Sequence, residues 1–396
     1  MSLRLTEILM KSMKVGRAFN EFTFEKPVNS LDFSDDGCNL VAADDGSLRI
    51  YNAVSGEYGD ILVKAAKIGV DLVRYTHHTD GVIHASKNGG NDDSIRYLSL
   101  HEHRYIRYFR GHRGPVVSLC VCPTGDQFLS SSQDGTLRLW DLRTQAGQGL
   151  LRVSCPRPVA AYDPTGQVFG VLTSPTVLRL YDVRSYDRGP FSSFQIAPDA
   201  FDPPGVAIEA ACLKFSPDGK YMLLPTRHHG ILLLDAFTGS KLRTLRDHYP
   251  PDHTLRPSPT APLLEASFSP DSQFIASGAA DGRVLVWSAE RGVPVAIWQP
   301  PALPAEGPLP ATALRWNPRK AMLATGCGPL CFWIPDGARM AEAADAAGVA
   351  LPPMPFGYPA PGPPPAPAGG PGYPTGPGGP YDPAAQAPPY GGPGYR

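Results

Sequence analysis

Short apolar stretches separated by tight polar turns recur along most of this 396-residue chain. Runs such as Val116–Val121 and Gln127–Ser131 are short, alternating or apolar, and bounded by turn residues, which is the pattern of β-strands. The turns contain Pro, which presets one backbone dihedral angle, or Gly, which permits positive φ, or both, so each predicts a hairpin. These turns are Ser34–Gly37, Pro123–Gly125, Pro164–Gly166, Ser216–Gly219, Ser269–Ser272 and Asn317–Arg319.

A second motif repeats in phase with the turns and ends in an aromatic or aliphatic residue, which a short polar residue follows. The clearest copy is Asp134–Asp141, with relatives at Asp45–Tyr51 and Asp281–Trp287. Weaker copies end at Leu98, Tyr181, Leu234 and Trp333. Successive ends lie roughly 41 to 53 residues apart, near the roughly 40–45 residues of a WD40 propeller blade. Seven ends predict seven blades.

These repeats predict the fold class. A unit of about four short strands cannot bury both faces alone, but radial stacking covers the faces and leaves only short edges. We therefore expect an all-β protein with a single seven-bladed WD40 β-propeller over residues 29–335. The last repeat stops near Ile334 with one strand missing. We expect residues 1–28 to supply that strand through Lys14–Asn20 and to close the ring.

The composition changes after the last repeat, so residues 336–396 form a separate predicted region. Gly337–Gly348 is rich in Ala and predicts a short helix. Residues 351–396 consist almost entirely of Pro, Gly, Ala and Tyr, which cannot bury enough apolar surface to fold, so we expect a disordered tail. It is either a passive tail or a peptide ligand through Pro361–Pro367. Two proline-rich insertions, Tyr249–Pro262 and Pro300–Pro310, predict surface loops.

The charge balance and the cysteine content limit the kinds of partner and the cellular compartment that we expect for this protein. The chain has 36 Lys and Arg against 37 Asp and Glu, which argues against nucleic acid as the main partner, because phosphate binding needs a clustered basic surface. Seven scattered cysteines indicate reduced thiols in the cytosol or nucleus. No apolar run approaches a membrane-spanning length, and the first 19 residues lack the features of a secretory signal.

One repeat carries polar residues that resemble catalytic groups. His112 lies one strand upstream of Ser132, Asp134 and Trp140. In a blade these side chains can hydrogen-bond in series, so we interpret His112, Ser132, Asp134 and Trp140 as a structural network. The chain has no nucleophile elbow, Walker loop, dinucleotide fingerprint or zincin motif. We therefore expect no enzyme activity, cofactor or metal.

The second repeat is a candidate binding surface because it is dense in Arg and Tyr. Both residue types are enriched in interface hot spots, since they combine large contact area with directed hydrogen bonds. The alternative is that the tyrosines pack between blades and the arginines are solvated, and strand alternation means that not all of them can face one partner. The candidates are Arg74, Tyr75, Arg96, Tyr97, Arg104, Tyr105, Arg107 and Tyr108.

Several segments resemble one specific WD-repeat family. The first are Ile68–His77, Asp92–His101 and Tyr105–Phe109, and the later ones are Leu180–Ser185, Gly189–Phe191, Asp235–Phe237 and Glu265–Ile275. From about Leu5 to Pro335 the chain is similar to the Swd2 family, which includes WD repeat-containing protein 82 and provides WD40 subunits of SET-domain (COMPASS) histone methyltransferase complexes. The proline loops and the tail depart from the family pattern.

The resemblance implies a function that periodicity alone does not. Members of the family sit in nuclear complexes that methylate lysine four of histone H3, where they bind the SET-domain subunit and help to bring it to transcribing RNA polymerase II. They also serve a nuclear phosphatase complex and RNA 3′-end processing. An alternative function is substrate receptor of a cullin-RING ubiquitin ligase, because Arg143 and Arg184 end the WD-x-R-like segments Trp140–Arg143 and Tyr181–Arg184.

Overall fold

The computed structural model describes residues 4–20, 28–65, 69–87, 92–197, 207–227, 230–246, 263–300, 310–326 and 329–347. The chain divides into two compact units, residues 1–358 and 359–396, and all the described residues lie in the first. The predictions for residues 351–396 and for most of the two proline-rich insertions therefore lie outside the described residues.

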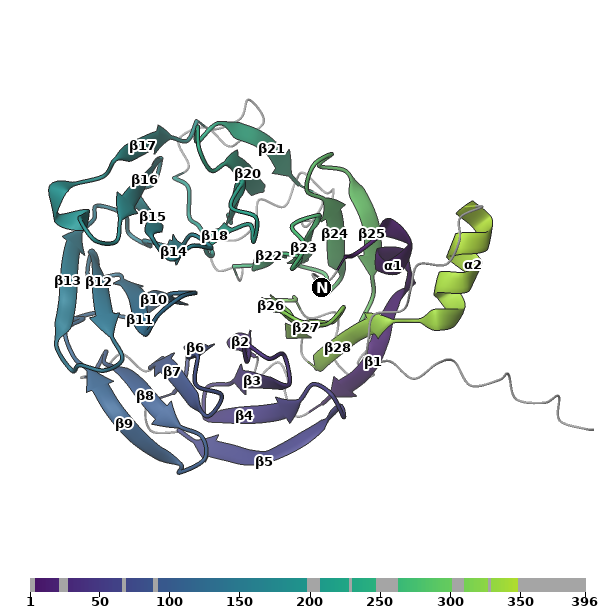
Figure 1. The fold of residues 1–396 in the computed structure, drawn as a ribbon, viewed down its shortest axis with the longest axis horizontal. Coiled ribbons are helices and arrows are strands. Elements are labelled where there is room, and N and C mark those ends of the chain that lie inside the picture. Colours follow the sequence, from purple (N-terminus) through teal and green to yellow (C-terminus); the bar gives the residue numbers. More distant parts are fainter. Residues whose placement is uncertain are drawn as a thin grey trace, which may run out of the picture. The chain divides into compact units, whose positions relative to one another are not determined.

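Seven four-stranded antiparallel sheets are arranged around a common centre (Figure 1), which confirms the predicted seven-bladed propeller. Each of the first six blades uses four consecutive strands, with the first at the centre and the fourth at the perimeter. The strands of blades one to three are β2 (Ser30–Phe33), β3 (Asn39–Ala43), β4 (Ser47–Asn52), β5 (Glu57–Lys64), β6 (Leu72–Tyr75), β7 (Gly81–Ala85), β8 (Ile95–Ser99), β9 (Arg104–Phe109), β10 (Val116–Val121), β11 (Gln127–Ser132), β12 (Thr136–Asp141) and β13 (Gly147–Arg152).

Blades four to six repeat this arrangement with longer connections between some strands. Their strands are β14 (Ala160–Tyr162), β15 (Val168–Ser174), β16 (Val177–Asp182), β17 (Ser192–Gln195), β18 (Lys214–Phe215), β19 (Tyr221–Pro225), β20 (Ile231–Asp235), β21 (Lys241–Leu245), β22 (Ala266–Phe268), β23 (Phe274–Gly278), β24 (Val284–Ser288) and β25 (Pro294–Trp298). A single 3₁₀ turn, η1 (Tyr186–Arg188), precedes β17 in the described part of blade four.

The N-terminus closes the ring, as the missing strand of the last repeat predicted. Blade seven contains β26 (Ala313–Trp316), β27 (Leu323–Gly326) and β28 (Leu330–Pro335), and its outer strand is β1 (Met13–Phe19). Strand β1 runs antiparallel to β28, with Lys14 opposite Ile334 and Phe19 opposite Leu330. The closing strand thus comes from the predicted segment, one residue earlier at each end than expected.

Two helices flank the closing strand. Helix α1 (Glu7–Ser12) begins at Thr6, whose side chain accepts a hydrogen bond from the Leu9 backbone N–H. Helix α2 (Gly337–Ala347) follows β28 and confirms the helix expected from the Ala-rich composition. None of the helices in the described ranges is long and apolar enough to cross a membrane.

The hydrophobic core is divided among the gaps between blades. Alternation along each strand points successive side chains toward opposite neighbouring blades. Strand β12 belongs to blade three. Its Leu137 and Leu139 side chains pack toward blade four, whereas its Trp140 side chain packs toward blade two. Seven clusters of buried side chains fill the seven gaps in this way. Each blade is therefore stabilised mainly by its two neighbours, and the ring must close for every gap to be filled.

Candidate protein-binding site

The second blade separates its Arg and Tyr residues according to the pleat of its strands. His84 on β7 lies opposite Arg96 on β8, and Arg96 lies opposite Tyr108 on β9. The alternate row contains Ile83, Tyr97 and Arg107 in the same manner. Since neighbouring rows point to opposite faces, the eight candidates cannot all lie on one face of the blade.

The Arg96 side chain is buried within blade two and is not accessible to a partner protein. The residue is 3 % exposed, its Nη2 atom lies 2.7 Å from Asp92 Oδ2, and its guanidinium lies 6.0 Å from the centre of the Tyr108 ring. Tyr108 in turn lies 5.5 Å from the ring of Tyr105. These contacts orient the two half-buried tyrosines at the outer edge of the blade.

His84 lies in the same row and is fully buried, and neither ring nitrogen has a hydrogen-bond partner among the residues that the structure describes. Burial, reinforced by the nearby positive charge of Arg96, lowers the pKa of His84 to about 3. The imidazole is therefore neutral at physiological pH, and its role is to fill the gap beside Tyr105, whose ring lies 5.7 Å away.

Three further candidates are also held within the fold. Tyr75 and Tyr97 are buried in the gaps on either side of blade two, and burial raises the pKa of both hydroxyls. Arg74 lies on the innermost strand, where its Nη1 atom donates to Ser30 Oγ at 2.8 Å and its Nε atom donates to the Leu119 carbonyl oxygen at 3.1 Å.

Four candidates remain at the perimeter on β9. Arg104 is exposed, Tyr105, Arg107 and Tyr108 are half-buried, and Arg107 donates a hydrogen bond to the Leu142 carbonyl oxygen of blade three. Ile106, which the sequence prediction did not include, is 45 % exposed between them. We call Arg104, Tyr105, Ile106, Arg107 and Tyr108 the outer-strand surface.

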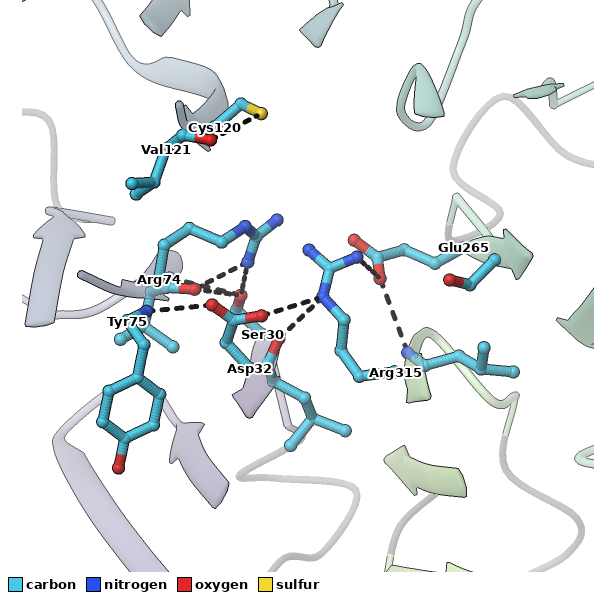
Figure 2. Close-up of polar contacts among 12 residues, drawn as sticks. Ser30, Asp32, Arg74, Tyr75, Cys120, Val121, Glu265 and Arg315 are labelled. Atoms are coloured by element: carbon cyan, nitrogen blue, oxygen red, sulfur yellow. Dashed lines mark hydrogen bonds and ion pairs between the residues drawn. The ribbon is translucent and has the colours of Figure 1, made fainter. Parts of the chain in front are cut away.

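A group of charged residues lines the central channel, and the sequence analysis missed it. Asp32, Arg74, Lys214 and Arg315 occupy equivalent places on the inner strands β2, β6, β18 and β26. Figure 2 shows Asp32 between Arg74 and Arg315, with Glu265 approaching Arg315 from the other side. Arg315 Nε lies 3.4 Å from Asp32 Oδ1, and Lys214 Nζ lies 3.6 Å from Glu265 Oε2.

Attraction between the charged residues of the channel offsets the cost of their burial only in part. Burial disfavours the charge of Glu265, yet Lys214 and Arg315 outweigh it and lower the pKa of this carboxyl to about 2. Burial raises the pKa of Asp32 and lowers the pKa of Arg74 and Lys214. A pocket of about 360 Å³ opens beside Arg74 and Glu265 and is also lined by Asp71 and Arg157.

A repeated pattern could have revealed this group. Each of the four channel residues stands between an apolar residue and an aromatic one, as in Leu31-Asp32-Phe33 and Leu314-Arg315-Trp316. Alternation points the flanking residues into the gaps between blades and the charged residue toward the centre of the ring. The pattern had to be aligned across repeats, because within any single repeat it resembles a solvent-facing strand position.

The blade-three network exists, but its serine differs from the prediction. His112 Nε2 lies 2.8 Å from Ser130 Oγ, Trp140 Nε1 donates to the same oxygen at 2.8 Å, and His112 Nδ1 lies 3.0 Å from Asp134 Oδ2. Ser132 instead donates to the Gly114 carbonyl oxygen and accepts the Asp134 backbone N–H. The prediction of Ser132 as the link was therefore wrong.

The register of the hairpin explains this correction. Ser132 lies directly opposite Thr136 at the hairpin end, whereas Ser130 lies two residues further along, near the indole of Trp140. Ser130 is 1 % exposed, so the Ser130–His112–Asp134 series is enclosed in the blade. Burial opposes the Asp134 charge, but hydrogen bonds from Thr136, the Arg113 backbone and His112 lower the pKa of Asp134 to about 2.

The two arginines of the WD-x-R-like segments lie on the surface. The Arg143 side chain is 72 % exposed, and its guanidinium binds the buried Asp141 carboxylate through Nε at 3.0 Å and Nη2 at 2.6 Å. Arg184 is also exposed. Both are accessible to a partner, and their role as an adaptor contact stays a prediction.

The histidine clusters that the structure describes do not converge on a metal site. His77 contacts Asp35 and the Cys122 carbonyl oxygen, His101 and His103 lie on an exposed turn, and residues 228–229 lie outside the described residues. Within the described ranges, no three His, Cys, Asp or Glu side chains are grouped so that they could hold a metal ion.

Comparison with known proteins identifies relatives that match most of this chain. The family model "WD domain, G-beta repeat" matches residues 19–52, 103–141 and 239–288. "WD repeat-containing protein 82" of Drosophila melanogaster is 40% identical over 336 residues, which cover 85% of this chain and 98% of that protein. "Set1 complex component swd2" of Schizosaccharomyces pombe is 39% identical over 69% of this chain and 74% of its own length. "COMPASS component SWD2" of Saccharomyces cerevisiae is 30% identical over 78% of this chain and 91% of its own length.

Proposed function

The chain belongs to the WD-repeat family of WD repeat-containing protein 82 and Swd2, and from this premise we propose that it is a non-enzymatic scaffold subunit of a nuclear COMPASS-like complex that methylates lysine four of histone H3. The observation that carries the proposal is the match of 40% identity that covers 98% of the Drosophila relative. Two fungal relatives bear names that place them in the Set1 complex or COMPASS.

The geometry of the polar groups supports a binding role. Ser130, His112 and Asp134 resemble a catalytic series, but the serine oxygen also accepts the indole N–H of Trp140 and is enclosed in the blade. A nucleophile must reach its substrate, and this hydroxyl is committed to packing. What the fold presents to other molecules is the perimeter of the ring and the two openings of its channel.

The proposed partner is the SET-domain methyltransferase subunit, and the outer-strand surface is the proposed contact. Tyr105, Ile106 and Tyr108 offer apolar area, while Arg104 adds an accessible cation. Aromatic residues and Arg together are typical of interface hot spots. Following the family resemblance, we further propose links to the RNA polymerase II machinery, to a nuclear phosphatase and to the cleavage and polyadenylation machinery.

Affinity purification of the tagged full-length chain from nuclei tests the proposal. We expect mass spectrometry to find a SET-domain methyltransferase, and the eluate to methylate lysine four of histone H3. Ile106→Ser should lower recovery of the methyltransferase about tenfold, the equivalent of ~1.4 kcal/mol. Leu150→Ser is the matched control, because Leu150 is also 45 % exposed on an outer strand but belongs to blade three.

The same purification separates the proposal from the ligase alternative. Recovery without any SET-domain, phosphatase or polyadenylation subunit contradicts the proposed function. Recovery of a cullin-RING adaptor that is lost on Arg143→Ala favours the substrate-receptor function instead. Equal losses for Ile106→Ser and Leu150→Ser refute the outer-strand surface as the contact without affecting the membership of the complex.

A further inference from the structure

An apolar groove lies between blades four and five, on the side where the first hairpin turn of each blade projects. One wall is the β14–β15 turn with Asp163 and Pro164, and the opposite wall is the β18–β19 turn with Pro217 and Asp218. Val168, Leu180 and Phe215 also line the groove, and its volume is about 490 Å³. This volume lies within the range of natural ligand pockets, roughly 300–1,000 Å³.

Two exposed phenylalanines stand at the mouth of this groove. Phe191 is 60 % exposed and Phe237 is 78 % exposed, and both line the groove. Full burial of a Phe side chain stabilises by about 1.5–3 kcal/mol relative to exposure, so two exposed rings at one concave site favour association with a partner. Both segments are among those that carry the family resemblance.

Hydrogen bonds order the backbone at both phenylalanines. The Phe191 N–H donates to the Leu180 carbonyl oxygen at 3.0 Å, which ties the segment to β16. The Phe237 N–H donates to Asp235 Oδ1 at 2.9 Å, and Gly239, at φ +68°, closes the same turn through the Asp235 carbonyl oxygen. A backbone that is already ordered loses little conformational entropy on binding, which favours affinity.

The groove is acidic at its edges. Asp163 and Asp218 line it, one from each blade, and no Lys or Arg of the described residues is part of the lining. Asp218 is held ionised, since hydrogen bonds from Ser216 and the Lys220 backbone outweigh its burial and lower its pKa. Asp218 also forms an ion pair with Lys220, whose Nζ atom lies 3.5 Å from Asp218 Oδ2 and whose side chain is 66 % exposed. Anionic lipids and nucleic acids would be repelled by these carboxylates.

We propose that the groove between blades four and five binds an extended segment of a partner protein that presents one large apolar side chain flanked by Lys or Arg. The apolar side chain enters the groove between Phe191 and Phe237, and the flanking cations lie against Asp163 and Asp218. This inference goes beyond the proposed function, because the recognition chemistry does not depend on which complex contains the chain.

Binding of synthetic peptides to the full-length chain tests the inference. The probes are fluorescein-labelled twelve-residue peptides with a central Phe, Leu or Trp and flanks of Lys and Arg, of Ser, or of Glu, measured by fluorescence anisotropy. We expect affinity to rank basic above neutral above acidic flanks, and to fall with salt for the basic peptides only. Phe237→Ser should weaken binding of every peptide at least tenfold.

Further variants separate the contribution of the carboxylates to peptide binding from that of the apolar groove. Asp163→Asn with Asp218→Asn should remove the preference for basic flanks, a loss of about tenfold, while leaving the neutral peptides unchanged. Ile297→Ser is the matched control, because Ile297 is 52 % exposed on β25 of blade six. Thermal midpoints within 2 °C of the parent protein, an expectation for exposed substitutions, verify that each variant is folded.

Four results would overturn the inference. One is binding that is insensitive to Phe237→Ser, the second is a preference for acidic flanks, and the third is absence of binding up to millimolar peptide. Self-association of the full-length chain that is abolished by Phe237→Ser would also overturn it, because the occupant would then be a second copy. Since the assay contains no methyltransferase, these results are independent of the proposed function.

Discussion

At the scale of single residues, blade three shows how one oxygen atom can satisfy two buried groups. Ser130 Oγ accepts the Trp140 indole N–H, and its own hydrogen is directed at His112 Nε2, which leaves His112 Nδ1 to donate to Asp134. Every polar group of the series therefore has a partner, and the desolvation cost of each is offset.

Replacing this serine should cost more stability than replacing its neighbour. Ser130→Ala leaves a buried indole N–H and a buried imidazole nitrogen without partners, so we expect a loss of about 2–3 kcal/mol in the free energy of unfolding. Ser132→Ala removes one hydrogen bond to the Gly114 carbonyl oxygen and should cost about 1 kcal/mol. Urea titration followed by tryptophan fluorescence measures both, and equal losses would contradict the assignment of Ser130 as the link.

His84 should make the stability of the protein depend on pH. Its pKa in the folded state is about 3, below the value of about 6.5 for an unfolded chain. The unfolded state therefore binds the proton first, so the stability contribution is complete above pH 6.5 and is lost as the pH falls toward 3. Between pH 7 and pH 5 the loss from this residue is about 2 kcal/mol.

The variant His84→Leu isolates this effect. It removes the titrating group but keeps an apolar side chain beside Tyr105, so we expect the stability difference between pH 7 and pH 5 to shrink by about 2 kcal/mol relative to the parent protein. Urea titrations at the two pH values measure it. His112, whose pKa is also lowered by burial, titrates in both proteins and cancels in the comparison.

At the scale of elements, helix α1 anchors the closing strand to blade six. Leu9 and Met10 are buried in the same cluster as Trp298 and Trp333, and the Trp298 indole N–H donates to the Met10 carbonyl oxygen at 2.7 Å. The helix has only six residues, too few for stability in isolation. Its stability thus comes from this docking.

A pair of adjacent substitutions tests the docking. Met10 is fully buried, so Met10→Ala should lower the free energy of unfolding by about 2–5 kcal/mol through lost burial and a cavity. Lys11 is exposed on the same helix, and Lys11→Ala should change stability by less than about 0.5 kcal/mol. Similar thermal midpoints for the two variants would show that α1 does not contribute to the core.

At the scale of the whole ring, closure by β1 decides whether blade seven is complete. Without β1, β28 would become an open edge with unpaired backbone groups, and such edges promote association between chains. The gap between blades seven and one would also lose Phe19, whose ring centre lies 4.6 Å from that of Tyr51 and 5.5 Å from that of Phe332.

Removal of residues 1–19 should therefore open the ring. We expect the thermal midpoint to fall by more than about 10 °C, as loss of a buried strand and helix costs several kcal/mol, and light scattering to detect soluble oligomers. Addition of a synthetic peptide of residues 4–20 should restore the midpoint and the monomer. A truncated chain that remains monomeric with an unchanged midpoint would disprove this closure.

The sequence by itself determined the seven blades, the closing N-terminal strand and the helix after the last strand. These features follow from local rules: turn residues mark hairpins, alternation marks strands, and the repeat length fixes the unit. The family membership also lay in the linear pattern. The presence of a polar network in blade three could also be predicted, because the buried side chains of His112 and Trp140 need hydrogen-bond partners.

Only the tertiary structure decided which side chains meet. Ser130 rather than Ser132 links the network because hairpin register, not spacing, sets its distance from Trp140. The eight Arg and Tyr candidates separated because packing between blades buried Tyr75, Arg96 and Tyr97 and left β9 exposed. The channel charges and the groove between blades four and five join residues more than 40 positions apart, and no local pattern can specify contacts that exist only once the ring has formed.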